Sequence, residues 1–332
     1  GSRRPPARKS RPGHQLLTSF LLNLLRIQGF VLIIPWHSGE VKKTSIRKGR
    51  ALTIAVALGV TTTSLFAASA APTLAATPVA RAVKSLPQAP RGIFVVGCRF
   101  SHTASDDPIV HPGMTGMSHL HQFFGNTSTN ANSTTESLLG ASTTCGEKND
   151  KSAYWVPALT VNGQPVAPIR ASVYYRGAKN KSVRALPNGF KLVTPRGDAT
   201  TFWTCKVGGV ATKRSTGAGD VPTCTGDEQL SAHVRFQSCW NGATDSSDHT
   251  SHVVYPGRRS VCPSTHPISI PALQLNVFYP RWVRGGPDLT LSSGNAASMH
   301  ADVFTAWTNG RQKVLVKKCL NRHRKCGAAR LV

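Results

Sequence analysis

The chain has 332 residues, of which 40 are Lys or Arg and 14 are Asp or Glu, so its formal net charge is +26 with His neutral. Hydrophobic residues make up 40 %, which excludes wholesale disorder, and charged residues only 16 %, which argues against a coiled coil. With 29 Gly and 22 Pro, the composition is typical of a turn-rich, mostly β protein.

The first 90 residues contain a candidate export signal. Residues 42–50 are basic, an apolar stretch runs from Ala51 to about Ala67, and small residues follow, with candidate cleavage sites at 68–70 and 74–76. This order predicts a secretory signal peptide over 41–76. We interpret residues 1–40 as a misplaced start or added sequence, with Val41 as the true initiator. The alternative is a transmembrane anchor, although polar residues interrupt its apolar part.

After this signal we expect a linker over 77–90, one β-rich domain over 91–319 and a basic tail over 320–332. Beyond residue 76 the chain holds 29 basic and 13 acidic residues. In an exported protein this balance suggests an anionic cell-envelope polymer as partner, whereas the alternative is a charge that serves only solubility. We expect no stable membrane span, no nucleic-acid partner and a monomer.

Short runs with strand-like composition recur along the domain. In 169–175, apolar side chains at every second position alternate with more polar ones, which is the period of a half-buried strand. The strongest candidates are 93–98, 154–160, 168–175, 190–193, 201–207, 233–236, 273–279 and 314–316. Only 301–307 has the composition of a short helix. We therefore predict an all-β fold, a single disulfide-stapled β-sandwich of jelly-roll type with long loops and a short C-terminal helix.

Turn signals separate these runs. Asn-Gly pairs at 162–163, 188–189 and 309–310 are typical of hairpins. The longest predicted loop, 125–144, is rich in Asn, Ser and Thr and contains glycosylation sequons at Asn126 and Asn132.

The eight cysteines favour disulfides in an oxidising compartment, since no Cys-x-x-Cys pair occurs. Eight cysteines allow 105 connectivities. Pairing of sequence neighbours is the simplest hypothesis, and it would join Cys98 to Cys145, Cys205 to Cys224, Cys239 to Cys262, and Cys319 to Cys326.

Histidines gather in three segments. The first contains His111, His119 and His121; the second contains His249 and His252, followed by His266; the third contains His300. On an extended strand His119 and His121 project to one face, where two imidazoles can ligate a metal or act as acid and base. Asp248 and Asp302 are placed to orient imidazoles. The alternative is that each histidine caps a turn or satisfies a buried carbonyl.

These residues define the predicted site. The catalytic candidates are His119, His121, Asp248, His249, His300 and Asp302. The candidate metal ligands, for a zinc-like divalent ion, are His119, His121 and His252. Substrate contacts are predicted at Asp107, Trp240, Tyr255 and His266. Trp155 and Trp307 are further candidates for stacking on sugars, although core positions are the alternative for such residues.

Long segments of the chain resemble a secreted bacterial and fungal family, the domain-of-unknown-function family nineteen-ninety-six. They are 107–113 (Asp-Pro-Ile-Val-His-Pro-Gly), 118–126 (Ser-His-Leu-His-Gln-Phe-Phe-Gly-Asn), 150–157 (Asp-Lys-Ser-Ala-Tyr-Trp-Val-Pro), 236–242 (Phe-Gln-Ser-Cys-Trp-Asn-Gly), 248–256 (Asp-His-Thr-Ser-His-Val-Val-Tyr-Pro), 262–267 (Cys-Pro-Ser-Thr-His-Pro), 293–295 (Ser-Gly-Asn) and 300–307 (His-Ala-Asp-Val-Phe-Thr-Ala-Trp). The resemblance extends from about Val96 to Cys319.

The resemblance implies little about activity. Fungal relatives often sit beside carbohydrate-binding WSC modules, which implies a cell-wall or plant-wall polysaccharide. Two positions depart from the family pattern, because Asn241 and Asn295 stand where the family has Asp. An acid at either position therefore cannot carry the chemistry here, whereas histidine-centred chemistry is unaffected.

We expect a secreted polysaccharide-active hydrolase or lyase that acts on an anionic polymer through the histidines, with or without a metal. The alternative is a non-catalytic module that binds the cell envelope or carbohydrate. A nuclease is the third hypothesis, disfavoured because no nuclease motif is recognised.

Overall fold

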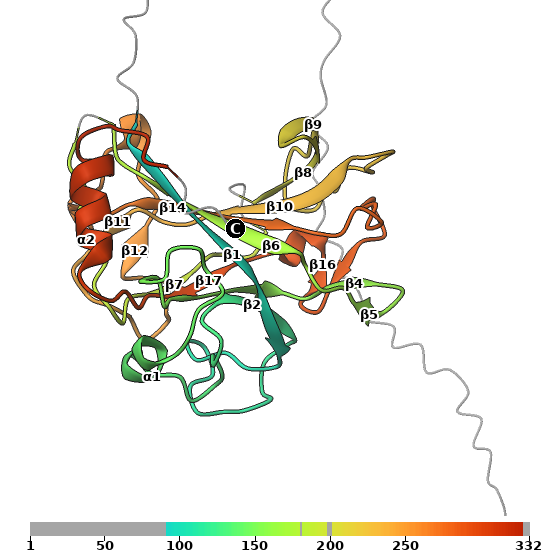
Figure 1. Ribbon diagram of the computed structural model, residues 1–332, viewed down its shortest axis with the longest axis horizontal. Helices are drawn as coiled ribbons and strands as arrows, with labels where there is room; N and C mark the ends of the chain where they lie inside the picture. The colour runs from blue at the N-terminus through green and yellow to red at the C-terminus, as the bar shows by residue number, and fades with distance from the viewer. Residues whose placement is uncertain (1–90, 180, 198–200, 328–332) are drawn as a thin grey trace, which may run out of the picture. The chain divides into compact units, whose positions relative to one another are not determined.

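The structure, a computed structural model, describes residues 91–179, 181–197 and 201–327. The predictions for the signal peptide, for residues 1–40 and for the linker 77–90 lie outside the described residues. Most of the regular structure is β (Figure 1), with strands β1 (Ile93–Ala104), β2 (His121–Gly125), β3 (Ala153–Pro157), β4 (Leu159–Val161), β5 (Gln164–Pro165), β6 (Arg170–Arg176), β7 (Lys191–Val193), β8 (Phe202–Val207), β9 (Val210–Arg214), β10 (Gln229–Arg235), β11 (Cys239–Trp240), β12 (Val253–Val254), β13 (Ile268–Ser269), β14 (Ala272–Phe278), β15 (Thr290–Leu291), β16 (Gly294–Asn295) and β17 (Asp302–Phe304). The helices are α1 (Thr135–Gly140) and α2 (Arg311–Leu315), with 3₁₀ turns at Arg258–Ser260 and Ala296–Ser298 and a π-helical turn at Val316–Leu320.

Ten strands form one antiparallel sheet in the order β7-β17-β3-β2-β1-β6-β14-β10-β8-β9. Strand β1 joins its two halves and crosses between them in Figure 1. Positions 93–99 of β1 pair with β6, whereas Phe100 and the residues after it pair with β2. The register shifts between Phe100 and His102. Such an irregularity bends a strand and increases its twist, which lets the sheet curl.

The two halves of the sheet share one hydrophobic core. Tyr154 of β3 and Tyr175 of β6 meet with their hydroxyl oxygens 2.7 Å apart. The Phe94 ring of β1 stacks on Tyr175 at 4.5 Å between centroids. Core residues of β6, β8, β10 and β14 belong to the same cluster as those of β3, β7 and β17. The mostly β fold is therefore confirmed, whereas the predicted jelly-roll sandwich is corrected to one large, curled antiparallel sheet and two small sheets, β12-β11-β13 and β16-β15-β4-β5.

The other face of β2, β3 and β17 is also buried. The segment 105–144, which includes α1, covers it through Ile109 and Leu138, and these residues pack with Phe123, Trp155 and Phe304. Alternate residues of β2, such as Phe124, face the main core instead. His121 is on the same face of β2 as Phe123, since side chains two residues apart on a strand share a face. The layer over this face therefore encloses His121.

Seven of the eight predicted strand segments contain observed strands. In 169–175 the alternation is confirmed by the burial of Ala171, Val173 and Tyr175, whereas Ile169 lies just before β6 and is 49 % exposed. The prediction for 314–316 is wrong, because these residues continue from α2 into a π-helical turn. Buried residues at 312, 316, 319 and 320 follow helical spacing there. Packing of this face outweighs the strand preference of a short Val-rich run.

The helix predicted over 301–307 is also wrong, since it contains strand β17. Asp302 pairs with Trp155 of β3 on one side and with Val193 of β7 on the other. Two neighbouring strands that satisfy its backbone override the helical preference of the Ala residues. The predicted short C-terminal helix does exist, but it is α2.

The three Asn-Gly pairs adopt different roles. Asn162-Gly163 forms the predicted hairpin between β4 and β5. The Asn188 side chain instead donates a hydrogen bond to the Trp307 carbonyl oxygen and accepts one from the Trp307 backbone N–H. Asn309-Gly310 directly precedes α2. The sequon residue Asn126 is buried and its amide bonds Leu138 and Lys151, so it serves the fold, whereas Asn132 is exposed.

All four disulfides join sequence neighbours as predicted. The pairs are Cys98–Cys145, Cys205–Cys224, Cys239–Cys262 and Cys319–Cys326. The last disulfide joins Cys319 to Cys326, which lies in the predicted basic tail. The Ile93 backbone also forms hydrogen bonds with the backbone of Arg324 and of Cys326. The described part of that tail, up to Gly327, is thus attached to β1. None of the helices in the described part of the chain is long and apolar enough to cross a membrane.

Gly125, at the end of β2, allows a direct test of this packing. Its φ is +81°, and a Cβ there would collide with the Ser152 carbonyl oxygen. We expect Gly125→Ala to lower the free energy of unfolding by more than about 2 kcal/mol in denaturant titrations. Gly140→Ala is the control, because nothing lies within 4 Å of the new Cβ, and it should change that free energy by less than about 1 kcal/mol. Equal effects of the two substitutions would contradict the packing described for β2.

Candidate functional site

The site begins where the chain enters β2. His121 is the first residue of this strand and pairs with Ala104 of β1 and Pro157 of β3. Its Nδ1 donates a hydrogen bond to the Asp106 carbonyl oxygen at 2.9 Å. The proton is therefore on Nδ1, and Nε2 keeps its lone pair. His119, two residues earlier, approaches with its ring centroid 4.2 Å from that of His121. The two imidazoles therefore lie side by side, although His119 precedes β2 and does not lie on an extended strand as predicted.

His300 arrives from the far end of the sequence, just before β17. Its Nδ1 donates to the Ser298 carbonyl oxygen at 2.8 Å, so its Nε2 also keeps a lone pair. The His300 ring lies 5.1 Å from the His119 ring and 6.0 Å from the His121 ring, between centroids. Two of the three predicted histidine segments therefore meet.

Two overlapping groups of ligand atoms occupy this place. One nitrogen from each of His119, His121 and His300 lies within 4.8 Å of the other two. Asp107, His121 and Asp302 form a second group within the same limit. His121 thus connects a set of three imidazoles to a pair of carboxylates.

Several of these atoms have no hydrogen-bond partner in the described structure. They are Nε2 of His119, Nε2 of His121 and both carboxylate oxygens of Asp302, and all four are buried. A buried polar atom without a partner costs about 1–3 kcal/mol, and a buried carboxylate more. Asp107 differs, because its Oδ1 accepts hydrogen bonds from the backbone of Ile109 and Val110. Asp107 therefore serves at least in part to hold the loop that carries the site.

Burial sets the protonation states. It lowers the pKa of His121 to about 3, with a contribution from the neighbouring His119, and lowers the pKa of His300 to about 3. Burial and Arg196 also lower the pKa of His119. The imidazoles are therefore neutral at physiological pH, which is the form that binds metals. The 3.9 Å approach of His300 Nε2 to Asp302 Oδ2 is not an ion pair for the same reason.

Asp302 is the opposite case. Only 1 % of it is exposed, and burial raises the pKa of its carboxyl well above the ordinary value, with nearby Asp107 adding to the rise. A cation beside this carboxylate would remove the cost of ionising it. The arrangement of three neutral imidazoles and one uncompensated carboxylate fits a divalent cation.

The clustered residues differ in exposure, although the Nε2 atom of His119 is itself buried. His119 is half-buried, whereas His121, His300 and Asp302 are buried. Arg196, which is exposed, is close enough to influence the pKa of His119, His121 and Asp302. The sequence analysis missed Arg196. No motif marks it, because the pairing of β7 with β17 brings it to the site.

The second histidine segment does not join this cluster. His249 Nδ1 lies 2.9 Å from Asp245, which also pairs with Lys191. His252 uses both ring nitrogens, toward Ser246 Oγ and the Lys191 carbonyl oxygen. Lys191 pairs with Phe304, two residues along β17 from Asp302. Local hydrogen bonds thus occupy His252, and His300 takes the place predicted for it.

Two more predicted residues have local roles in this region. Asp248 accepts hydrogen bonds from the Ser246 hydroxyl and from the backbone of Thr250 and Ser251, which makes it a turn residue. His266 lies with Nε2 2.8 Å from the Ser251 carbonyl oxygen. Neither is brought to the imidazole cluster.

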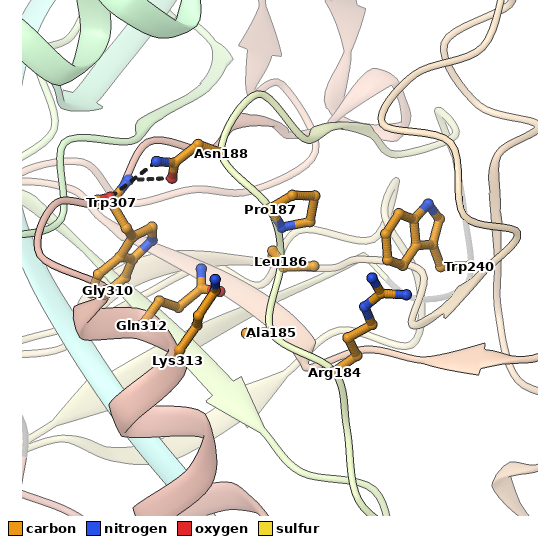
Figure 2. A pocket seen from close by; sticks show the side chains of 10 residues that line it. All are labelled: Arg184, Ala185, Leu186, Pro187, Asn188, Trp240, Trp307, Gly310, Gln312 and Lys313. Carbon is orange, nitrogen blue, oxygen red and sulfur yellow. Dashed lines mark hydrogen bonds between the residues drawn. The ribbon is translucent and has the colours of Figure 1, made fainter.

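The predicted aromatic contacts are dispersed. Trp155 is fully buried. Trp240 and Trp307 line a cavity of about 390 Å³ between the segment 184–188 and the start of α2 (Figure 2). Tyr255 lines another hollow, of about 420 Å³, beside β14. Asn241 and Asn295, the two positions expected to depart from the family pattern, are exposed turn residues whose side chains accept backbone hydrogen bonds.

The unpaired carboxylate predicts a distinct pH dependence. A raised pKa means that the metal-free folded protein retains a proton that the unfolded chain releases, so Asp302 destabilises the fold increasingly as pH rises above the ordinary Asp value. We expect Asp302→Asn to remove this loss. With a chelator present, the free energy of unfolding of the variant minus that of wild type should increase between about pH 4 and about pH 7, by at most about 1.4 kcal/mol per pH unit. The exposed Asp227→Asn is the control, and a constant difference for Asp302→Asn would contradict the buried, unpaired state.

Comparison with known proteins adds one result. A family model described as Domain of unknown function (DUF1996) matches residues 107–307, a range that contains Asp107, all three clustered histidines and Asp302. No curated protein and no solved structure matches the chain. The matched range is more than half of the chain, and the protein therefore belongs to the DUF1996 family.

Proposed function

We propose that the protein is a secreted hydrolase or lyase in which His119, His121 and His300 hold a divalent metal ion, and that it acts on an anionic cell-wall or plant-wall polysaccharide. The observation that carries the proposal is the cluster of buried, unpartnered atoms, namely Nε2 of His119 and of His121 and the carboxylate of Asp302. Four such atoms in one place are costly without a cation among them.

The ligand set favours a catalytic ion over a structural one. Structural zinc sites have four protein ligands, whereas catalytic sites commonly have three and keep one position open. The three imidazole nitrogens form one group here, and Asp302 belongs to the other, on the side of Asp107. The half-buried His119 marks the side from which a substrate can approach. A divalent ion supplies Lewis acidity at that position.

The charges around the site favour an anionic substrate. Arg196 adds a positive charge beside the imidazoles, and basic residues outnumber acidic ones by 29 to 13 beyond residue 76. A guanidinium can bind the carboxylate of a uronic acid with two hydrogen bonds. Asp107 and Asp302 are 3 % and 1 % exposed, so they do not provide the two accessible carboxylates that ordinary glycoside hydrolysis requires.

Secretion is supported by the four disulfides, because such bonds persist in oxidising compartments. Within the described residues no helix qualifies as a membrane span. The signal peptide expected over 41–76 agrees with this location.

Metal analysis tests the site directly. The purified protein should contain about one divalent ion per chain, and added Zn²⁺ should raise the melting temperature of the chelator-treated protein. His119→Ala/His121→Ala should lose both effects, since it removes two of the three ligands. His249→Ala is the matched control, because the His249 ring bonds Asp245, which is not part of the imidazole cluster, and its loss should leave the metal content unchanged. A folded double variant with full metal content would refute the ligand set.

Activity is tested separately on soluble polysaccharides with and without uronic acids. We expect turnover of a uronic-acid polymer, seen as new reducing ends for a hydrolase or as ultraviolet absorbance of an unsaturated uronate for a lyase. Chelation and the His119→Ala/His121→Ala variant should each abolish it, and His249→Ala should retain it. Binding without turnover in the metal-loaded protein would favour a non-catalytic carbohydrate-binding module.

A further inference from the structure

The half of the sheet formed by β6, β14, β10, β8 and β9 has an outward face rich in basic side chains. On β6, β14, β10 and β8, every second residue faces the core, as Val173, Leu275 and Val234 do. The residues between them face outward, and together with Arg214 of β9 they provide five cations, which we call the basic face: Arg170, Arg176, Lys206, Arg214 and Arg235. Because the two halves enclose one core, this face points away from the face that carries the histidine cluster.

The strand register places two of these cations, Arg170 and Arg214, in one row. Arg170 of β6 pairs with Phe278 of β14, which pairs with Ser231 of β10. Ser231 pairs with Thr204 of β8, and Thr204 pairs with Arg214 of β9. One row thus crosses five strands with a cation at each end. At about 4.8 Å between neighbouring strands, the row is about 19 Å long.

Two aromatic rings, Phe278 and Phe202, make cation–π contacts with these cations. The Arg170 guanidinium lies 3.8 Å above the Phe278 ring, and Lys206 lies 5.2 Å from the same ring. Arg214 lies 3.8 Å above the Phe202 ring. Phe202 and Phe278 are almost fully buried, so the guanidinium groups cover them. A guanidinium stacked on a ring keeps its N–H edges available for an anion.

The strands of this half that the structure describes contribute no carboxylate to this face. Among the outward residues of β1, β6, β14, β10 and β8, all of which the structure describes, none is Asp or Glu. Glu228, just before β10, is engaged by Thr212, Lys213 and Thr225. Burial lowers the pKa of Lys206 and so does the nearby Arg170, which shows that like charges crowd one another here.

A hollow lies further along the same strands, around Gln274, which is four residues before Phe278 of the row. Its volume is about 420 Å³, and Arg91, Arg176 and Arg235 line it together with Tyr255 and Gln274. Gln274 Oε1 accepts hydrogen bonds from Arg176 at 3.0 Å and from Arg235 at 3.3 Å, which fixes the two guanidinium groups beside each other. The space has the size of a small ligand site.

We infer that the basic face, with this hollow, binds a polyuronic acid chain at a site separate from the histidine cluster. Bidentate pairing of guanidinium with carboxylate suits the arginines, and the hollow accepts a sugar residue of the same chain. Single-stranded nucleic acid fits less well, because it requires exposed rings for base stacking and the rings here are covered. The choice of polymer rests on the proposed function, whereas the binding itself does not require the metal.

The test compares two charge-matched variants in direct binding to polygalacturonate. Arg170→Gln/Lys206→Gln/Arg214→Gln removes three cations of the basic face. Lys317→Gln/Lys318→Gln/Arg322→Gln removes three exposed cations near the C-terminal helix. We expect wild type and the second variant to bind alike, and the first to bind at least about tenfold more weakly with a shallower salt dependence. Neutral dextran should not bind to any of them.

Further arms keep the outcome decisive. Arg170→Lys/Arg214→Lys keeps the charge and should bind with intermediate affinity even if the triple variant does not fold, since lysine lacks the two-pronged pairing. Chelator-treated wild type and His119→Ala/His121→Ala should bind polygalacturonate normally, so failure of the metal site is distinguishable from failure of the basic face. Unchanged binding of the folded triple variant, no binding by wild type, or tighter binding of double-stranded DNA than of polygalacturonate would overturn the inference.

Discussion

The architecture depends on the change of partner within strand β1. Up to Arg99 this strand pairs with β6, and from Phe100 it pairs with β2. A flat sheet of ten strands would leave one face of each half uncovered. Because β1 bends at the register shift, the two halves close over one core, and the Tyr154–Tyr175 contact joins them. The same bend decides which strand faces become outward, and both candidate sites lie on outward faces.

Enclosure accounts for the chemistry of the histidine cluster. The layer formed by 105–144 removes water from His121 and Asp302, and both respond by favouring their neutral forms. For an imidazole this creates a ligand, because neutral nitrogen binds metal. For a carboxylate, removal of water makes the ionised form unfavourable unless a positive charge lies beside it. Backbone carbonyls of Asp106 and Ser298 fix the ring orientations, so the cluster is organised before any ion enters.

The sequence was informative where local chemistry dominates. Each cysteine pairs with the next one along the chain, and three of the four pairs are separated by 23 residues or fewer. The alternation in 169–175 identified the buried side of β6. The spacing of His119 and His121 was enough to predict that their imidazole rings lie close together. Local composition failed at 301–307, where strand pairing with β3 and β7 overrides helix preference. His252 resembled the other candidates in sequence, and only its bonds to Ser246 and Lys191 distinguish it.

The positions of the two candidate sites limit how they can work together. They occupy outward faces of two layers that share a core, and packed sheets lie about 10 Å apart, so several sugar units separate the sites. A short oligosaccharide cannot contact both. A long polymer can, and binding at the basic face would then raise its local concentration at the imidazoles. In the proposed function, the basic face would contribute to capture of the polymer, while orientation of the reacting sugar would depend on residues near the cluster, such as Arg196.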